Sequence, residues 1–328
     1  VSMKHVGLNV AADPFVNSAM TGANGGLLVI SADDPSMHSS QNEQDSRFYA
    51  RFAMLPILEP SDQQEAYDMG AYGFELSEKL RLPVMLRLVT RLSHSRAVVT
   101  TDSVATEENT MAYPADTRRW VLMPGNSRVR YKDLIAQQAQ MEAMSEESPF
   151  NSLTPGTDSR LGIIASGIAA NYVKECFAEG CPFSVLKISQ YPLPKQKIAE
   201  LASACDAIIV IEEGQPVIEE SLRGLLDRGL KVYGRLDGHL PRTGELTPDC
   251  VAAALAGLLP DMKEQLTHPA AMPSDKVVAR PPALCQGCGH RDVYAALNAA
   301  LETFESPKVF GDIGCYTLGW LAPFNAID

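Results

Sequence analysis

The chain has 328 residues, of which 45% are hydrophobic and 21% are charged, and its formal net charge at pH 7 is −12. This length is enough for two or three domains with their own cores. The acidic balance excludes nucleic acid as the main partner, because phosphate binding needs a basic surface. No apolar run reaches membrane-spanning length and no signal peptide opens the chain, so no membrane partner is expected.

The seven cysteines are an odd number, and four of them are scattered among apolar or loop positions: Cys176, Cys181, Cys205 and Cys250. This distribution favours a reducing, cytoplasmic location over a disulfide framework. The chain begins with Val1 rather than Met, and it ends soon after a glycine-rich turn, where an α/β unit normally continues. We therefore expect a fragment of a larger protein.

Predicted strands and helices alternate along the first hundred residues, which is the pattern of an α/β fold. The expected elements are a turn at residues 1–9, a helix at 13–21, a buried parallel strand at 27–30, a helix at 62–80 and a buried strand at 83–88. After the last of these strands, Arg87, Arg91, His94 and Arg96 form a basic cluster. A ligand-facing role is open for this cluster, but a basic surface is the preferred interpretation.

A polar segment, residues 31–47, follows the strand at 27–30 and contains the run His-Ser-Ser-Gln-Asn-Glu-Gln-Asp. Proteins of the α/β class place ligands at the carboxyl ends of their strands. A ligand-binding loop and a solvated loop both fit this segment on composition alone.

A second α/β region follows residues 97–158, whose weaker periodicity indicates a linker with an exposed amphipathic helix at 131–145. Its expected strands are residues 160–165, 183–188, 207–212 and 230–233, and its expected helices are residues 168–179, 195–204 and 217–228. Four strands alternating with three helices predict a small doubly wound domain. The strand ends carry no complete catalytic set.

Two glycine-rich turns lie near the C-terminal end, at residues 285–290 and 311–319. A helix is expected at residues 292–304 and a short buried strand at residues 309–310 between the turns. Glycines let a backbone approach a ligand closely, and amides at a helix N-terminus favour an anion such as a diphosphate. The turns also carry Cys285, Cys288 and Cys315, for which an iron–sulfur centre, a zinc site and a structural role all stay open.

Three segments of the chain resemble the large (alpha) subunit of indolepyruvate:ferredoxin oxidoreductase, in the thiamine diphosphate-dependent 2-oxoacid:ferredoxin oxidoreductase superfamily. They are residues 3–9 (Met-Lys-His-Val-Gly-Leu-Asn), residues 33–45, and the two glycine-rich turns. The resemblance runs over nearly the whole chain in the same order and is weakest at residues 97–158.

The resemblance implies an α/β fold in which thiamine diphosphate-binding domains flank a doubly wound domain. The implied domains are residues 1–100, an incomplete pyrimidine-binding domain; 101–155, a linker; 156–262, a transketolase C-terminal-like domain; and 279–328, the start of the diphosphate-binding domain.

The resemblance also implies an activity, the oxidative decarboxylation of indolepyruvate or another arylpyruvate with coenzyme A. The products are an aryl-acetyl-CoA, CO₂ and reduced ferredoxin, as in amino-acid catabolism. The implied cofactors are thiamine diphosphate, Mg²⁺ and [4Fe-4S] clusters, and the implied partners are a smaller beta subunit and ferredoxin. Thiamine supplies the electron sink that a 2-oxoacid needs to lose CO₂.

The resemblance and the chemistry together suggest residue roles. Arg47 is expected to bind the substrate carboxylate, because Arg suits bidentate capture, although pairing with Asp45 or Glu43 on a surface is the alternative. The other expected site residues are His38, Gln41 and Asn42 near the reacting centre; His5, Asn9, Gly287, Cys288, Gly289, His290, Gly311, Asp312, Gly314 and Cys315 at the cofactor; and Cys285, Cys288 and Cys315 as cluster ligands.

Two other functions stay open. One is a thiamine enzyme of the same superfamily for another 2-oxoacid, such as phenylpyruvate or a branched-chain acid. The other is a non-catalytic zinc or scaffold module held by the three cysteines. The resemblance places the glutamate that activates thiamine before Val1 and the Mg²⁺ motif after Asp328, so residues 1–328 alone are expected to be inactive.

Overall fold

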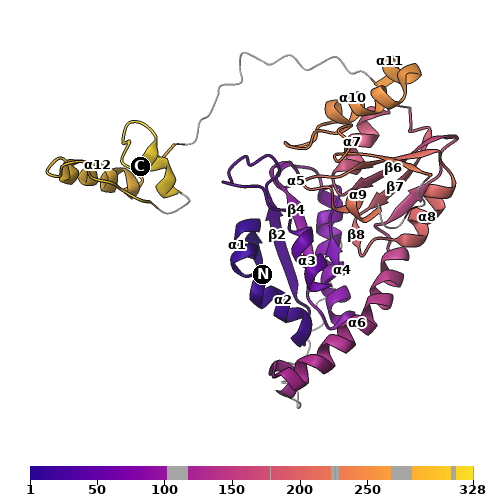
Figure 1. The fold of residues 1–328 in the computed structure, drawn as a ribbon, viewed down its shortest axis with the longest axis horizontal. Coiled ribbons are helices and arrows are strands. Elements are labelled where there is room, and N and C mark those ends of the chain that lie inside the picture. The colour runs from indigo at the N-terminus through magenta and orange to yellow at the C-terminus, as the bar shows by residue number, and fades with distance from the viewer. Residues whose placement is uncertain are drawn as a thin grey trace. The chain divides into compact units, whose positions relative to one another are not determined.

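The computed structural model describes residues 1–101, 117–177, 179–222, 226, 229–266, 283–311 and 315–327. The chain forms two compact units, Val1–Pro269 and Ala270–Asp328 (Figure 1). The described residues of the first unit form two five-stranded sheets. None of the described helices is both long and apolar enough to cross a membrane.

The first sheet is built mainly from the N-terminal hundred residues. Its strands, in spatial order, are β1 (Ser2–Lys4), β2 (Leu28–Asp33), β4 (Val84–Val89), β3 (Ile57–Leu58) and β8 (Gln190–Tyr191). The first four are parallel, and β8 pairs antiparallel with β3. Strands β2 and β4 are mainly apolar and mostly buried, which is typical of parallel strands covered on both faces.

Five helices follow the strands of this sheet in the sequence. They are α1 (His5–Val10), α2 (Ala12–Thr21), α3 (Arg47–Ala53), α4 (Gln63–Leu80) and α5 (Thr90–His94). The start of α4 is fixed by Asp62, whose side chain accepts a hydrogen bond of 2.8 Å from the backbone amide of Glu65. In return, the Glu65 carboxylate accepts from the amide and hydroxyl of Ser61, so the two acidic residues hold the first turn from both sides.

The second sheet is built from the region after residue 150. Its order is β10 (Lys231–Tyr233), β9 (Ala207–Ile211), β6 (Asp158–Ser166), β7 (Phe183–Ile188) and β5 (Ser152–Thr154). All are parallel except β5, which pairs antiparallel with β7 at the edge. The helices that accompany this sheet are α7 (Ala169–Cys176), α8 (Lys195–Ser203), α9 (Val217–Leu222), α10 (Pro248–Leu258) and α11 (Lys263–Leu266).

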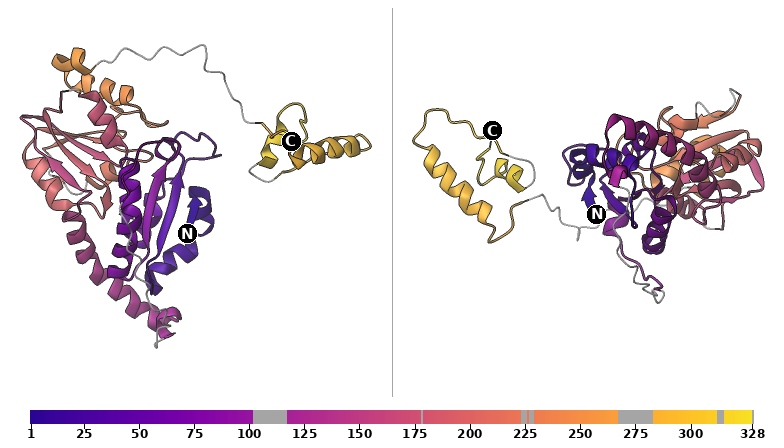
Figure 2. Two further views of the ribbon diagram at one scale, coloured as in Figure 1. Left: turned by 180° about the vertical axis from the view of Figure 1, so that it is seen from behind. Right: turned by 90° about the horizontal axis from the view of Figure 1, so that it is seen from below.

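The two sheets share one apolar core, which contains Leu58 and Met85 from the first sheet and Ile164 and Leu186 from the second. The long helix α6 (Pro124–Glu146) contacts α2 on one side and α8 and β8 on the other (Figures 1 and 2). Short 3-10 helices lie at Thr117–Trp120 and Pro260–Met262. Both sheets and α6 therefore belong to one folded unit.

The second unit is small. It contains helix α12 (Gly289–Leu301) and a 3-10 helix at Cys315–Trp320. Leu284, Tyr294 and Ala326 form its buried core, and the hydroxyl of Tyr294 donates to the backbone oxygen of Tyr316 at 2.7 Å. A side chain at Gly319 would overlap the ring of Tyr294, so glycine is required for this contact.

The predicted α/β fold and doubly wound second region are confirmed, with each expected strand up to residue 233 within three residues of an observed one. The helix expected at 131–145 is present as part of α6, which begins earlier, at Pro124, and buries Leu134, Met141 and Ser145. Three predictions were wrong. Residues 2–10 form β1 and α1 rather than a turn. Arg87 lies inside β4, fully buried, rather than at a surface.

The third wrong prediction is the strand at residues 309–310. These residues form no strand, and Phe310 is 87% exposed. Their apolar character suggested a strand, but the described part of the second unit contains no strand with which they could pair. The expected helix at 217–228 is described only to Leu222, because most of residues 223–228 lie outside the described ranges.

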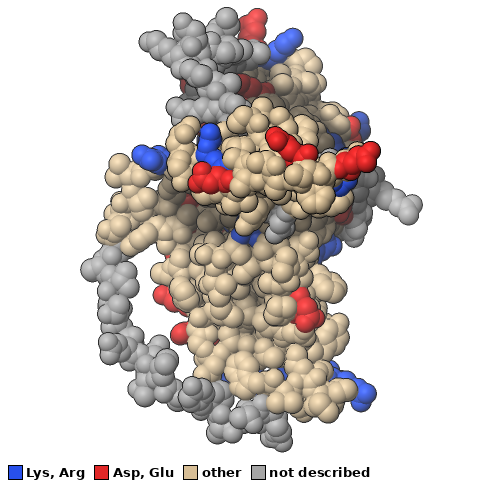
Figure 3. All heavy atoms as spheres, turned by 90° about the vertical axis from the view of Figure 1, so that its left-hand side faces the viewer, with Lys and Arg blue, Asp and Glu red and all other residues tan. Residues whose placement is uncertain are grey.

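On the face shown in Figure 3, basic and acidic residues are interspersed, and the described residues of neither sign gather into one patch. A dense group of charged side chains does occur inside the first unit, at the carboxyl ends of its parallel strands.

Candidate active site

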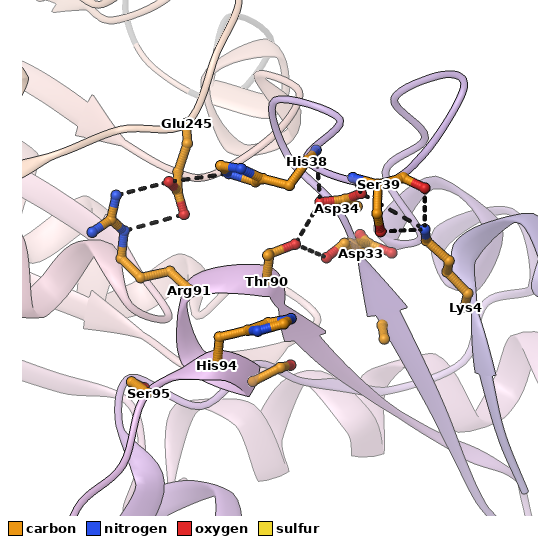
Figure 4. Close-up of a pocket in the computed structure, with 12 residues that line it drawn as sticks. Lys4, Asp33, Asp34, His38, Ser39, Thr90, Arg91, His94, Ser95 and Glu245 are labelled. Atoms are coloured by element: carbon orange, nitrogen blue, oxygen red, sulfur yellow. Dashed lines mark hydrogen bonds and ion pairs between the residues drawn. The ribbon is translucent and has the colours of Figure 1, made fainter. Parts of the chain in front are cut away.

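A pocket of about 710 Å³ lies in the first unit, where β1, β2 and β4 end (Figure 4). Lys4 ends β1, Asp33 ends β2, and α5 follows β4, so parallel strands bring their carboxyl ends to one place. The loop after β2 contributes His38 to the wall, and Glu245 enters from the segment between β10 and α10. This is the usual ligand position in a parallel α/β sheet.

Asp34 shapes the loop that follows β2. Its carboxylate accepts hydrogen bonds from the amides of His38 and Ser39, at 3.2 and 2.9 Å, and from the hydroxyls of Ser40 and Thr90, at 2.6 and 2.7 Å. Burial opposes the charged form, but these donors outweigh it and hold the pKa of Asp34 well below its ordinary value. The ionised side chain therefore fixes the loop against α5.

The same loop contains two non-glycine residues in the left-handed region, Ser36 at φ 70° and Met37 at φ 57°. Such a conformation costs energy for residues with a Cβ and persists only where neighbouring contacts impose it. Here the Asp34 hydrogen bonds lie on one side, and a 2.9 Å bond from the amide of Ser36 to the Glu43 carboxylate lies on the other. The loop therefore holds His38 at the pocket wall.

Arg91, His38 and Glu245 form an ion group at the pocket wall, called here the pocket ion group. The Arg91 guanidinium donates to the Glu245 carboxylate from Nε at 3.1 Å and from Nη2 at 2.7 Å. His38 Nε2 lies 3.3 Å from Glu245 Oε2. The side chains of Arg91 and His38 are 37% and 49% exposed, so solvent reaches both.

A second ion group adjoins the pocket through Asp33 and is almost completely buried. It consists of Asp33, Asp45, Arg47, Glu59, Arg87, Glu212 and Glu213, each at most 4% exposed, and is called here the buried ion cluster. Arg87 donates from Nε to Asp33 at 2.6 Å, from Nη1 to Glu59, and from Nη2 to the backbone oxygen of Glu213 at 3.1 Å. The cluster therefore joins strand ends of the first sheet to the segment after β9 of the second.

With Arg235, which is 3% exposed and lies 3.7 Å from Glu213, three arginines face the five carboxylates of this cluster, and burial shifts the protonation of several of these carboxylates. Burial raises the pKa of Asp33 and of Glu212, despite the attraction of Arg87 and Arg47 respectively. Burial also raises the pKa of Glu213 to about 7, although Arg235 and the amide of Leu246 favour its charged form. Asp45 differs, because Arg47 and Arg87 outweigh burial and lower its pKa to about 2.

Arg47 lies in the buried ion cluster and does not line the pocket. Its guanidinium donates to Asp45 at 2.6 Å, to Glu212 at 2.8 Å, and to the backbone oxygens of Glu213 and Gln215, both at 2.8 Å. The expected pairing with Asp45 is present, but it is buried instead of exposed. With its donors occupied and no solvent contact, Arg47 is not placed to bind a substrate carboxylate in this structure.

Of the other site residues expected in the first unit, only one lines the pocket. His38 lines the pocket, whereas Gln41 and Asn42 are exposed on the loop beyond it. His5 is fully buried, with Nε2 3.2 Å from the backbone oxygen of Asn42 and Nδ1 3.4 Å from that of Ala32. Asn9 is exposed on α1 and does not line the pocket.

The first glycine-rich turn of the second unit has a geometry that fits an anion. Gly287 has a φ of 74°, Gly289 begins α12, and neither glycine has an atom within 4 Å of where a Cβ would lie. The open turn and the amides at the start of a 13-residue helix therefore fit a diphosphate group. Cys288 Sγ lies 3.1 Å from His290 Nδ1 in this turn.

The second glycine-rich turn is described only in part. A Cβ at Gly311 would lie 2.5 Å from the terminal Cδ1 of Ile327, so the space beside this glycine is filled by that side chain and is not open to a ligand. Asp312 and Gly314 lie outside the described residues. Cys315 is exposed at the start of the 3-10 helix.

The cysteines do not fit a metal cluster in this geometry. Among the residues that the structure describes, no three His, Cys, Asp or Glu side chains lie close enough to hold one ion. Cys285 and Cys315 are exposed and Cys288 is half-buried. An iron–sulfur cluster needs its cysteines gathered around it, and the described part of the second unit does not gather them.

Sequence reasoning missed several residues that shape the pocket, namely Lys4, Asp34, Thr90 and Glu245. Arg91 was noticed, but a surface role was preferred for it. The signal for Thr90 and Arg91 was available, because both follow directly after the carboxyl end of an apolar parallel strand. Glu245 gave no such signal, since it lies 154 residues from Arg91 in the sequence.

Comparisons with known proteins identify close relatives over the whole chain. The chain is 41% identical to indolepyruvate oxidoreductase subunit IorA of Methanothermobacter thermautotrophicus, covering 99% of this chain and 54% of that protein. It is 37% and 38% identical to the subunits of the same name from Archaeoglobus fulgidus and Pyrococcus abyssi, covering all of this chain and 53% and 52% of theirs. The chain thus spans about half the length of the curated relatives it matches.

No protein-family model matches the chain. Among solved structures, it is similar to 2-oxoglutarate:ferredoxin oxidoreductase from Magnetococcus marinus, whose structure has 2-oxoglutarate, coenzyme A and succinyl-CoA bound. The TM-score is 0.56 at 14% sequence identity, covering 81% of this chain and 53% of that one. At this identity, the similarity shows a shared fold.

Proposed function

Because the chain belongs to the family of indolepyruvate oxidoreductase subunit IorA, we propose that it is part of an enzyme that oxidatively decarboxylates arylpyruvates. The proposed substrate is indolepyruvate, the acyl acceptor is coenzyme A and the electron acceptor is ferredoxin. A smaller partner subunit is part of the proposal. A cytoplasmic location, Mg²⁺ and the domain boundaries stay predictions from the sequence.

The observation that carries the proposal is the pocket at the carboxyl ends of β1, β2 and β4. A 2-oxoacid is an anion with a polar keto group, and this pocket offers it Lys4, His38 and Arg91 as partners of positive or polar character. Its volume of about 710 Å³ is within the range of small-molecule sites, roughly 300–1,000 Å³. An indole ring with its three-carbon acid is well within that size.

The second unit would hold the phosphates of the cofactor. Gly287, Cys288, Gly289 and His290 form an open turn at a helix N-terminus, where backbone amides favour a diphosphate. Thiamine diphosphate, when bound, supplies the electron sink that decarboxylation of a 2-oxoacid requires. The chain's own task is then to bind and orient: α12 for the diphosphate, and the pocket of the first unit for the acid.

The proposal is tested with the complete enzyme, including its partner subunit. We expect ferredoxin reduction that depends on coenzyme A and on a 2-oxoacid, with a higher kcat/KM for indolepyruvate than for phenylpyruvate or 2-oxoisovalerate. If none of the three acids supports ferredoxin reduction, the proposed function is overturned. A preference for 2-oxoisovalerate would retain the reaction and replace the substrate.

A matched pair of histidine variants ties the activity to this pocket. His38 lines the pocket, whereas His239 lies outside it and pairs with Asp237 at 3.0 Å. We expect His38→Ala to raise KM for indolepyruvate about tenfold, the size of one lost charge-assisted hydrogen bond, and His239→Ala to leave it unchanged. Equal effects of the two substitutions would show that the pocket is not the substrate site.

A further inference from the structure

The charged side chains around the pocket differ in how many hydrogen-bond and ion-pair partners they have within the protein. Asp33 is held by Arg87 of the buried ion cluster, and Asp34 is saturated by the donors of its own loop and Thr90. Arg91 and Lys4 are the cations that line the pocket, and they lie at opposite ends of it, with Asp33 and Asp34 between them (Figure 4). Arg91 and His38 both turn towards one carboxylate, that of Glu245 (Figure 4).

The Glu245 carboxylate contacts Arg91 with the geometry that a bound ligand carboxylate would have. Two nitrogens of the guanidinium contact its two oxygens, which is the bidentate geometry of carboxylate recognition. The ring of Tyr172 lies 5.7 Å from the guanidinium carbon and supports the cation from another side. Arg91 is thus oriented for a carboxylate, and the protein provides one from its own chain.

The segment that carries Glu245 is anchored immediately beyond it. The amide of Leu246 donates to the Glu213 carboxylate at 3.2 Å, the Leu246 side chain is fully buried, and Thr247 caps α10. On the other side, Gly244 has a φ of 87°, a conformation that glycine adopts without strain. Glu245 thus lies between the anchored Leu246 and the conformationally free Gly244. The Glu245 side chain can therefore move away from Arg91 while Leu246 stays in place.

Separating this pair costs less than separating a sealed pair. The Arg91 side chain is 37% exposed and the Glu245 side chain 13%, so water and salt screen the pair through its arginine, whereas the buried ion cluster is closed to solvent. A ligand carboxylate that gains Arg91, His38 and the apolar wall of the pocket therefore replaces Glu245 at low cost. The same exchange is not available at Arg47, whose partners are sealed from solvent.

We propose that Arg91 and His38 bind the carboxylate of the 2-oxoacid, and that Glu245 occupies this position as an internal competitor until the acid displaces it. The inference rests on the proposed function and adds the binding residues and the competitor. It makes Glu245 a determinant of affinity and selectivity, because a ligand without a negative charge has no means of replacing it at Arg91.

The test compares a charged and a neutral probe on the complete enzyme. Binding of indole-3-propionate, which cannot be decarboxylated as a 2-oxoacid, and of its neutral amide is measured by calorimetry. We expect Arg91→Gln to weaken binding of the acid about tenfold or more, the effect of a lost charge-assisted contact. We expect Glu245→Gln to strengthen binding of the acid about threefold to tenfold, and neither substitution to change binding of the amide.

Two further variants guard against a general loss of structure or charge. Arg96→Gln removes an exposed cation that follows α5 and does not line the pocket, and Glu264→Gln removes an exposed carboxylate on α11. Both should leave binding of the acid unchanged. Arg91→Lys, which keeps the charge and loses the bidentate contact, should fall between the wild type and Arg91→Gln.

A double variant measures the competition itself. If Glu245 competes for Arg91, the gain from Glu245→Gln disappears when Arg91 is already Gln. Unchanged or weakened binding of the acid in Glu245→Gln would overturn the competitor role, and unchanged binding in Arg91→Gln would overturn the carboxylate site. Turnover of indolepyruvate by the wild type is measured in parallel. If the wild type turns over indolepyruvate, an unexpected binding result counts against the carboxylate site or the competitor. If the wild type does not, the proposed function itself has failed.

Discussion

The first unit places two arginine–carboxylate groups at the same end of its sheet, and they differ in access to solvent. In the buried ion cluster, Arg47 and Arg87 are at most 1% exposed and contact carboxylates and backbone oxygens from both sheets. In the pocket ion group, Arg91 is 37% exposed and pairs with one carboxylate. We therefore expect the arginine–carboxylate pairs that are sealed from water to stabilise the fold. We expect the pair that is open to water to give up its carboxylate partner to a ligand.

The position of each arginine along its strand explains the difference. Arg87 lies inside β4, and its buried side chain is held by Asp33 and Glu59 and by the backbone oxygen of Glu213, which follows β9 of the second sheet. Arg91 lies in α5, beyond the strand end and at the pocket. Breaking the sealed group should therefore affect stability, and breaking the open group should affect binding.

The largest expected effect comes from breaking the sealed group. Arg87→Met removes the shared cation and leaves Asp33 and Glu59 as buried carboxylates without it, so the free energy of unfolding should fall by about 3–5 kcal/mol. Urea unfolding at pH 7 measures it. The matched substitution Arg91→Met at the open group should cost less than about 1 kcal/mol. Similar losses for the two variants would refute the distinction between the groups.

The second effect concerns the protonation of Glu213. Burial raises its pKa from an ordinary value of 4.5 to about 7, so in this range the folded chain binds a proton that the unfolded chain releases. The stability contributed by this group therefore falls as pH rises from about 4.5 to 7. In Glu213→Gln this dependence is absent.

The pH effect is measured as the difference in unfolding free energy between wild type and Glu213→Gln. That difference should shift by about 3 kcal/mol between pH 4.5 and pH 7, with the wild type losing stability relative to the variant. Glu264→Gln, at an exposed position, serves as the control and should follow the wild type. Parallel pH profiles for wild type and Glu213→Gln would mean that Glu213 is ionised throughout.

The smallest expected effect is on the open group. Glu245→Gln should change the free energy of unfolding by less than about 1 kcal/mol, because its partners Arg91 and His38 are 37% and 49% exposed and keep solvent contact, although Glu245 itself is only 13% exposed. The same urea titration measures it, at low and at high salt. A loss of several kcal/mol would place Glu245 with the structural carboxylates and remove the basis for its displacement by a ligand.

The fold was accessible from the sequence because its strands are marked by their own composition. Apolar runs such as those of β2, β4 and β9 need burial on both faces, and Asp62 marks the start of α4. The short β1 carried no such signal, since its three residues include Lys4 and it is identified by its pairing with β2.

The site was accessible only in part, because it depends on contacts between distant segments. The polar loop after β2 was considered as a ligand loop from its place at a strand end, and His38 does line the pocket. The sequence did not show that Arg47 would meet Glu212, 165 residues away, or that Arg91 would meet Glu245. The burial of an arginine is decided by such partners and not by its neighbours in the chain.

The most direct test of the carboxylate site is an experimental structure of the complete enzyme with indolepyruvate or indole-3-propionate bound. We expect the ligand carboxylate within about 3 Å of the Arg91 guanidinium nitrogens, with the Glu245 side chain moved away and Arg47 still paired with Asp45 and Glu212. A ligand carboxylate held elsewhere, with Glu245 still on Arg91, would contradict the proposed exchange.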